Sequence, residues 1–254
     1  MIFYFSATGN SKYVASRIGV ATGDQLVSIV DCLKKERFHF SLTENEMLGF
    51  VTPTYFWGLP TVVTDFLGRL EVETVGDHYT FHVLTFGTAT GTANDMLAQQ
   101  LAANSIALNG RFAVRMVDTW TPLFDLSDEA KNREVTAAAE PQIAEVIEKI
   151  RSHTPGNFNR NQGTWKLASP ALYAAYKNGR KTKKFAVADS CIGCGLCAKN
   201  CPVDAIQLRE GKPVWTKEQC TLCLGCLHRC PEFAITYGKN TAKHGQFVNP
   251  NVQL

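Results

Sequence analysis

The feature that most constrains this chain is a repeated cysteine pattern. Eight of its nine cysteines lie between residues 191 and 230, in two copies of the spacing C-x2-C-x2-C-x3-C-P offset by 29 residues. The copies, 191–206 and 220–235, each close on an Ala-Ile pair. Segments this short cannot bury an apolar core by themselves, so we expect an inorganic group to hold the two copies together.

The spacing of the cysteines indicates which inorganic group that is. Three thiolates within seven residues can wrap one compact iron–sulfur cube, and in two-cluster proteins the fourth cysteine ligates the cluster of the other copy. Structural zinc, the alternative, prefers two well-separated C-x2-C knuckles. We therefore predict two [4Fe–4S] clusters. Their ligands would be Cys191, Cys194, Cys197 and Cys230 for one cluster, and Cys220, Cys223, Cys226 and Cys201 for the other.

The first 152 residues alternate between strand and helix patterns. The candidate buried strands are Ile2–Phe5, Leu26–Ile29, Met47–Thr52, Thr80–Phe86 and Phe112–Val117. Helical patterns occur near residues 11–21, 61–70, 92–105 and 128–152. Alternation of this kind predicts a doubly wound α/β domain with five parallel strands, helices on both faces of the sheet and a ligand site at the carboxyl ends of the strands.

Three loops at those strand ends form the candidate ligand site. The first, 6–11, opens a helix and could bind a phosphate, although Ser, Thr and Asn also serve as ordinary helix caps. The second, 53–60, contains three consecutive aromatic residues that suit the walls of a flat ring system. The third, 85–91, has glycines that let backbone amides approach a ligand. The candidate residues are Ser6, Thr8, Gly9, Asn10, Ser11, Thr54, Tyr55, Phe56, Trp57, Gly58, Thr85, Phe86, Gly87 and Thr88.

The three loops resemble those of flavodoxins, with S-A-T-G-N-S at the phosphate loop, PTYFWGLP as the first flavin loop and TFGTATG as the second. Together with the cysteine repeat, the chain resembles the fused flavodoxin–ferredoxin family found largely in anaerobes. The resemblance implies a flavodoxin-like domain that binds FMN noncovalently, followed by a small α+β domain of the bacterial 2[4Fe–4S] ferredoxin type. It implies that residues 6–11 hold the phosphate, 55–57 border the ring system and 86–88 meet its polar edge.

We divide the chain accordingly into four segments. They are a flavodoxin-like FMN domain at 1–153, a basic linker with a short helix near Ser169-Pro170 at 154–185, a ferredoxin domain at 186–238 and a tail at 239–254. One departure from ordinary flavodoxins is the missing stacking Tyr in the last flavin loop, where Phe86 is the available aromatic residue. We therefore hypothesise that one flavin face is less covered and receives a second redox group or a small acceptor, with Trp120 as a competing cover.

The charge of the chain is unevenly distributed. From Lys149 to Ala188 there is no acidic residue but nine basic ones. Since the whole chain has a net charge of +3, the residues outside this window together carry a net charge of −6. Trp165, Tyr173 and Tyr176 interleave with these charges, as in single-stranded nucleic-acid sites. The cluster domain beside them is anionic once loaded, which favours internal charge compensation and docking of a partner protein over nucleic acid.

These cofactors predict an electron-transfer iron–sulfur flavoprotein that links one-electron carriers to a flavin. The alternative is an FMN-dependent reductase of a small-molecule oxidant, and a third option is a flavodoxin domain that only supports the ferredoxin. No catalytic acid–base pair is evident, which leaves open whether the chain is an enzyme. Expected partners are ferredoxin-type donors or acceptors, and a homodimer is left open. Without a basic leader or a membrane-spanning apolar run, we expect a cytoplasmic protein.

Overall fold

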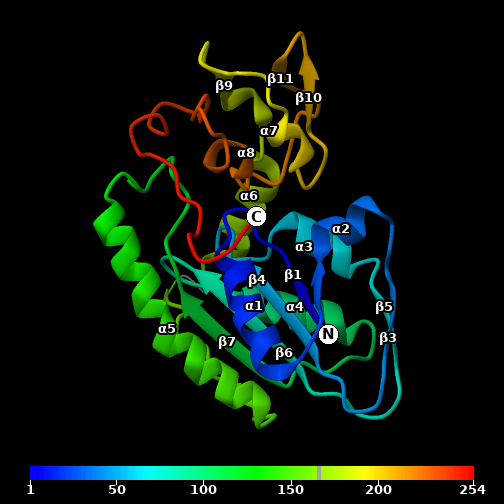
Figure 1. Cartoon of the computed structure of the whole chain (residues 1–254). Coiled ribbons are helices and arrows are strands. Elements are labelled where there is room, and N and C mark those ends of the chain that lie inside the picture. Colours follow the sequence, from blue (N-terminus) through cyan, green and yellow to red (C-terminus); the bar gives the residue numbers. More distant parts are fainter. Residues whose placement is uncertain (165–166) are drawn as a thin grey trace.

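The computed structural model describes residues 1–164 and 167–254, which form a large α/β domain with a small cysteine-rich domain above it (Figure 1). Trp165 and Lys166, in the predicted basic linker, lie outside the described residues. Helix α6 (Ser169–Gly179) lies between the two domains. Within the described part of the chain, no helix is both long and apolar enough to cross a bilayer.

The large domain is built on a parallel sheet of six strands in the order β2-β1-β4-β6-β7-β8. Five of them correspond to the predicted strands: β1 (Ile2–Tyr4), β2 (Leu26–Ser28), β4 (Leu48–Pro53), β6 (Thr80–Phe86) and β7 (Gly110–Arg115). The sixth, β8 (Gly156–Asn157), corrects the expectation of five strands. It is a two-residue edge strand beside Gly110 and Arg111, and no apolar pattern marks it in the sequence.

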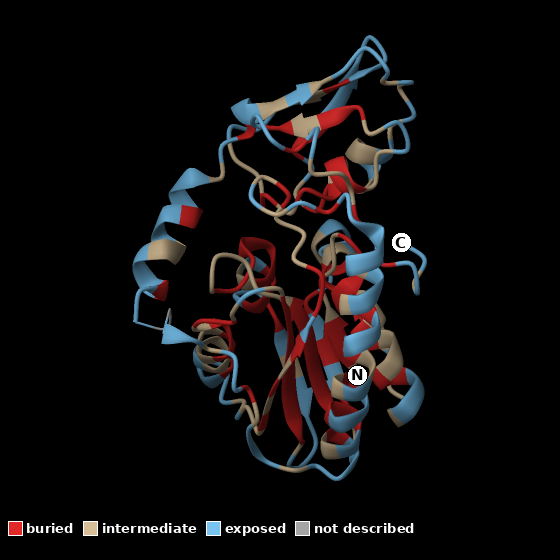
Figure 2. Ribbon diagram, turned by 90° about the vertical axis from the view of Figure 1, so that its left-hand side faces the viewer, coloured by how far each residue is buried: buried red, intermediate tan, exposed pale blue. Residues whose placement is uncertain are grey.

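Helices cover both faces of this sheet, whose strands are buried between them (Figure 2). Side chains at successive strand positions point to opposite faces. Phe3 therefore packs with the buried residues of α3 (Thr61–Leu67) and α4 (Ala93–Ala102). Its neighbour Ile2 packs with those of α1 (Asn10–Thr22) and α5 (Glu129–Arg151). The doubly wound flavodoxin-like fold follows from this arrangement.

Three further elements at the rim of the large domain were not expected from the sequence. Helix α2 (Ile29–Lys34) follows β2 directly and buries Cys32. Strands β3 (His39–Leu42) and β5 (Glu71–Thr74) form a separate two-stranded parallel sheet. Both strands are four residues long, β3 exposes alternate residues and β5 exposes three of its four, so their apolar signal is too weak to identify them.

The small domain repeats one unit twice, as the cysteine pattern predicts. Each copy places its third cysteine in a short helix, α7 (Leu196–Lys199) or α8 (Gly225–His228). Each copy then continues into a strand, β10 (Ile206–Arg209) or β12 (Ile235–Tyr237). Strand β10 pairs with β11 (Lys212–Trp215), and β12 pairs with β9 (Phe185–Val187), both antiparallel.

Helix α6 joins the two domains through its tyrosines. The hydroxyl of Tyr173 donates to the carbonyl of Leu59 in the large domain at 2.8 Å. The hydroxyl of Tyr176 donates to the carbonyl of Thr221 in the small domain at 2.9 Å. The predicted linker therefore includes a helix that contacts both domains.

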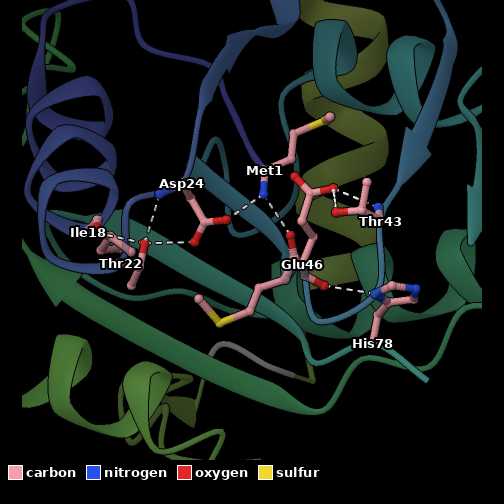
Figure 3. Close-up of polar contacts among 8 residues, drawn as sticks. Met1, Ile18, Thr22, Asp24, Thr43, Glu46 and His78 are labelled. Carbon is pink, nitrogen blue, oxygen red and sulfur yellow. Dashed lines mark hydrogen bonds and ion pairs between the residues drawn. The ribbon is translucent and has the colours of Figure 1, made fainter. Parts of the chain in front are cut away.

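The amino ends of the sheet strands, opposite the candidate site, are closed by a polar network (Figure 3). The amino group of Met1 donates to the Asp24 carboxylate at 2.6 Å and to the Met47 carbonyl at 2.8 Å. The ring of His78 contacts the Glu46 carbonyl at 2.7 Å. These contacts fix β1 beside its neighbours, and the opposite ends of the same strands carry the candidate loops.

Candidate functional site

A cavity of about 860 Å³ opens at the carboxyl edge of the main sheet, a size typical of small-molecule sites. All three predicted loops line it. The predicted residues that border it are Ser6, Thr8, Asn10, Ser11, Thr54, Tyr55, Phe56, Trp57, Thr85, Phe86, Gly87 and Thr88. Gly9 and Gly58 do not line it: Gly9 faces Asn249, and Gly58 lies against the Tyr173 ring.

The first loop turns from β1 into α1 through Gly9, whose φ of 99° is a left-handed value that glycine adopts without strain. The Gly9 N–H donates to Ser6 Oγ at 3.1 Å, which closes the turn. The first α1 hydrogen bond runs from the Tyr13 N–H to the Gly9 carbonyl. The N–H groups of Asn10 and Ser11 precede that bond, so they are available to an anion at the helix terminus.

The side chain of Asn10 is held by protein groups on two sides. Its Nδ2 donates to the Val117 carbonyl at 3.1 Å, and its Oδ1 accepts from Asn249 Nδ2 at 3.0 Å. Ser11 Oγ is 2.7 Å from Thr85 Oγ1, which joins the first loop to the third. These two side chains therefore fix the loop, which borders the cavity through Ser6, Ala7 and Thr8 as well.

The second loop is a tight hairpin in which Tyr55 and Gly58 exchange backbone hydrogen bonds of 2.9 and 3.0 Å. Phe56 and Trp57 at its tip have φ values of 48° and 63°. A left-handed conformation costs roughly 1–2 kcal/mol for residues with a Cβ. The Thr92 N–H holds the Trp57 carbonyl at 2.9 Å, and the Phe56 ring stacks on Tyr176 at 5.1 Å. The fold thus holds Phe56 and Trp57 in a left-handed backbone conformation that is unfavourable for such residues, and this places both at the cavity.

The third loop packs against Asp118, which follows β7 and brings a carboxyl group into the site. A Cβ on Gly87 would overlap the side chain of Asp118, so glycine is required for this close approach. Asp118 lines the cavity, accepts the Trp120 N–H at 3.1 Å, and has its pKa raised by burial. Sequence reasoning missed Asp118, because an isolated acid after a strand carries no spacing signal.

The donor set of this cavity fits a flavin mononucleotide. The hydroxyl of Thr54 is buried and has no hydrogen-bond partner among the described residues, so it is available to a ligand. Aromatic residues of the second loop and residues of the first loop, at the start of α1, border the same cavity. Trp120 also borders the cavity, with its ring 5.0 Å from Phe56 and 6.1 Å from Tyr237.

Two smaller cavities lie within the small domain, each bordered by four cysteines. The structure groups Cys230 with the first copy of the repeat and Cys201 with the second, as in the predicted crossed pairing; the ligand assignment itself stays a prediction. The cysteines that border the first cavity are Cys191, Cys194, Cys197 and Cys230. Those that border the second are Cys201, Cys220, Cys223 and Cys226.

The chemistry of these cysteines fits iron–sulfur ligation. Backbone N–H groups donate to the sulfurs of Cys201, Cys220 and Cys230 at 3.2, 3.3 and 3.3 Å. Burial raises the pKa of Cys220 to about 11 and that of Cys223 to about 12. Thiolates in such surroundings require nearby positive charge, which iron supplies.

The two copies reach the same backbone conformation with different residues. Gly193 and Gly195 have φ values of 69° and 76°, and the equivalent Leu222 and Leu224 have 51° and 54°. Both leucines line the large cavity, as does Cys223 between them. The second copy therefore accepts backbone strain where its side chains form a wall of that cavity.

The large cavity is consequently shared between the two domains. Cys223 borders both this cavity and the second cysteine cavity. A Cβ on Gly225 would lie 3.6 Å from the Ala7 carbonyl, so the second copy packs directly on the phosphate loop. The first cysteine cavity lies away from this contact, and there Cys194 is exposed and Ile192 is 64% exposed.

Known protein families match both parts of the chain. The flavodoxin domain family matches residues 1–140, and the 4Fe-4S dicluster domain family matches residues 190–235. Two solved structures resemble the large domain. The Trp repressor binding protein of Bacillus subtilis is 10% identical, with a TM-score of 0.32, over 56% of this chain and 95% of its own. A flavodoxin from the domain Archaea is 15% identical, with a TM-score of 0.29, over 58% of this chain and 96% of its own.

Curated relatives match the cysteine-rich part. A component of an ion-translocating oxidoreductase complex from Methanosarcina acetivorans is 44% identical over 18% of this chain and 17% of its own length. An uncharacterized ferredoxin of Methanocaldococcus jannaschii is 46% identical over 19% of this chain and 31% of its own length. The chain thus covers less than a third of either relative. A ferredoxin of Methanothermococcus thermolithotrophicus is 39% identical over 19% of this chain and 85% of its own.

The flavodoxin domain family covers more than half of the chain, and the ferredoxin match covers most of a complete ferredoxin. Both matches coincide with the domains seen in the structure. The chain therefore belongs to the flavodoxin domain family, with a 4Fe–4S ferredoxin domain fused after it.

Proposed function

We propose that this iron–sulfur flavoprotein transfers electrons between two [4Fe–4S] clusters and FMN within a single chain. The observation that carries the proposal is that Cys223 borders both the large cavity and the second cysteine cavity. A cluster held by Cys223 would therefore lie next to a flavin in the large cavity, with no intervening layer of protein.

The proposed FMN site uses the three loops in distinct ways. Amides at the start of α1 and the side chains of Ser6 and Thr8 would hold the phosphate. Tyr55, Phe56 and Trp57 would border the ring system, with Thr54, Thr85 and residues 86–88 at its polar edge. The flavin would supply one- or two-electron chemistry and each cluster one-electron chemistry. The protein residues exclude water and set distances.

The proposed cluster site nearer to solvent is the one bordered by Cys191, Cys194, Cys197 and Cys230. The exposure of Cys194 and of the neighbouring Ile192 and Leu196 supports electron exchange with a partner protein at this end. The other cluster site lies on the side of the small domain that faces the large cavity, which it meets at Cys223. We therefore propose that a ferredoxin-type donor or acceptor docks near the exposed cysteines.

The proposal is tested by anaerobic reconstitution with iron, sulfide and FMN. We expect about eight iron atoms and one flavin per chain, and flavin reduction after the clusters are reduced with a limiting reductant. The rate of that internal transfer should not change with protein concentration, because donor and acceptor share one chain. A flavin-free holoprotein, or a rate that rises in proportion to concentration, would contradict the proposal.

A reductase of a small oxidant is the second candidate function. The cavity continues beyond the flavin loops to Lys184, Lys239 and Asn240, where polar side chains border it. Single-turnover mixing separates the two functions. Reoxidation of the flavin by protein acceptors alone indicates a carrier, whereas saturable reoxidation by one small molecule indicates a reductase.

A further inference from the structure

The segment 244–253, here called the C-terminal strap, connects the two domains on the outer side of the phosphate loop. In Figure 1 the red end of the chain descends from the small domain and finishes beside the start of α1. The strap does not line the large cavity. Any effect it has on a ligand must therefore pass through the loop residues that it contacts.

The first part of the strap contacts both domains. The Leu126 N–H of the large domain donates to the His244 carbonyl at 2.7 Å. Gln246 Nε2 donates to the carbonyls of Leu227 and Cys230 at 2.6 and 2.9 Å. The Phe247 N–H donates to His228 Nδ1 at 3.2 Å. His228 Nε2 in turn contacts the Thr119 carbonyl of the large domain at 2.9 Å. The strap therefore joins α8 and its cysteines to the large domain.

The second part of the strap is fixed to the phosphate loop through Asn249. Its N–H donates to the Thr8 carbonyl at 2.8 Å, and its Nδ2 donates to Asn10 Oδ1 at 3.0 Å. A Cβ on Gly9 would lie only 2.9 Å from the Asn249 Cβ, so the loop is shaped to admit this residue. Lys12 Nζ also donates to the Gln253 carbonyl at 2.7 Å.

Asn249 is a buried side chain whose polar groups are satisfied. It is 1% exposed, and its Oδ1 accepts the Asn251 N–H at 3.0 Å while its Nδ2 bonds Asn10. Satisfied buried polar groups select one arrangement over its alternatives, because any displacement leaves a donor or an acceptor without a partner. Asn249 thus specifies the orientation of Asn10 and of the loop backbone.

We propose that Asn249 is a positioning residue for the flavin phosphate, and that the strap couples phosphate binding to the attachment of the ferredoxin domain. The inference rests on the proposed binding of FMN at this loop. The coupling is reciprocal. If attachment of the strap increases the affinity of the loop for the phosphate, then bound phosphate must stabilise the attachment of the strap by the same free energy.

The first test compares Asn249→Ala with wild type and with the control Asn251→Ala, whose exposed side chain is removed while its N–H remains. The probes are FMN and riboflavin, which lacks the phosphate, added to the cluster-loaded chain under anaerobic conditions. Loss of one buried hydrogen bond weakens binding about fivefold. We expect Asn249→Ala to raise the Kd for FMN about fivefold and to leave the Kd for riboflavin unchanged.

The outcomes of this test are distinguishable. An unchanged FMN Kd in Asn249→Ala, or an equal loss for FMN and riboflavin, overturns the positioning role while the proposed function stands. Failure of the wild-type chain to bind FMN overturns both. The control Asn251→Ala should bind FMN as wild type does, and an equal loss in this variant also contradicts the specific role of Asn249.

A second test uses the wild-type chain and does not depend on how a variant folds. Amide hydrogen exchange of a peptide covering residues 244–249 reports opening of the strap, because the Asn249 N–H is bonded to Thr8. We expect FMN to slow this exchange about fivefold and riboflavin to leave it unchanged. Equal exchange with and without FMN would overturn the coupling.

Discussion

His82 is fully buried in β6, where both ring nitrogens have protein partners. Nδ1 lies 3.0 Å from Asn94 Nδ2, which can only donate, so Nε2 carries the proton and donates to Thr52 Oγ1 at 2.9 Å. Burial and, to a smaller extent, the nearby charge of Arg111 lower the pKa of His82 to about 3. The folded chain therefore holds this imidazole neutral.

This histidine predicts a loss of stability in mild acid. The unfolded chain takes up a proton near pH 6.5, whereas folded His82 does so only near its lowered pKa of about 3. Its contribution is therefore complete above pH 6.5 and lost as the pH falls toward 3. Between pH 7.5 and 5.5 the free energy of unfolding should fall by about 1.4 kcal/mol from this residue.

Urea unfolding at the two pH values checks this prediction. His82→Gln should remove that part of the pH dependence, because an amide can replace both ring contacts without titrating. His39→Gln is the matched control, since the His39 side chain is 78% exposed. An identical pH dependence in His82→Gln and wild type would show that His82 is not responsible.

The crossed grouping of cysteines predicts which cluster a given substitution damages. Cys201→Ser should remove the cluster of Cys220, Cys223 and Cys226, although Cys201 belongs to the first copy of the repeat in sequence. Iron content should then fall by about half. The double variant Cys201→Ser/Cys223→Ser should then lose no more iron than either single variant. Cys201→Ser/Cys194→Ser should lose nearly all of it. The reverse pattern of iron counts would refute the pairing.

At the scale of single residues, the sequence could predict those residues whose chemistry depends on a fixed spacing along the chain. The eight cysteines and the loop residues were identified because their chemistry depends on neighbours in the sequence. Asp118 and Asn249 were not identified, since each acts through a contact between distant segments. Gly9 and Gly58 were predicted as ligand-binding residues, and the structure shows that they also permit close packing of Asn249 and Tyr173 behind the loops.

At the scale of elements, buried strands could be predicted because both faces of the sheet are covered. A run such as Thr80–Phe86 is buried at every position and has no polar face to interrupt it. The edge strand β8 and the pair β3–β5 depend on partners supplied by the fold. Helix α6 was predicted from Ser169-Pro170 and its tyrosines, and the structure places it at Ser169–Gly179.

The third loop offers a test of the cavity wall at this scale. Gly87→Ala should displace Asp118, because the added Cβ would overlap its side chain, and we expect FMN affinity to fall at least tenfold. Gly68→Ala, at the end of α3, is the control, since its Cβ would make only ordinary contacts of 3.4 Å or more. Fluorescence titration with FMN measures both. Equal affinity in the two variants would place the flavin elsewhere.

At the scale of the whole molecule, the basic linker contributes to contact between the domains. Arg180 Nη1 donates to the Cys220 carbonyl at 2.8 Å and to Thr61 Oγ1 at 3.3 Å. One of the basic residues in the acid-free window is thus placed beside a predicted cluster ligand. This contact supports charge compensation within the chain as one role of the basic window.

Tyr176 provides the test of domain attachment. Tyr176→Ala removes the hydrogen bonds of its hydroxyl with Thr221 and Thr61 together with its stacking on Phe56, whereas Tyr176→Phe removes the hydrogen bonds alone. We expect proteolysis within 154–185 to accelerate at least tenfold for the alanine variant and only a few-fold for the phenylalanine variant. If both variants were cleaved at the wild-type rate, α6 would not hold the domains together.

The contact between Asn10 and Asn249 also has a consequence for the timing of synthesis. The two residues are 239 positions apart in the chain. At translation rates of about 5–20 residues per second, the ribosome needs roughly 10–50 s to reach the second after making the first. The large domain can fold in that interval, but its phosphate loop lacks its contacts with Asn249 until that residue has been made. A newly made chain would therefore mature in sequence, acquiring a fully supported flavin site only after the cluster domain has emerged.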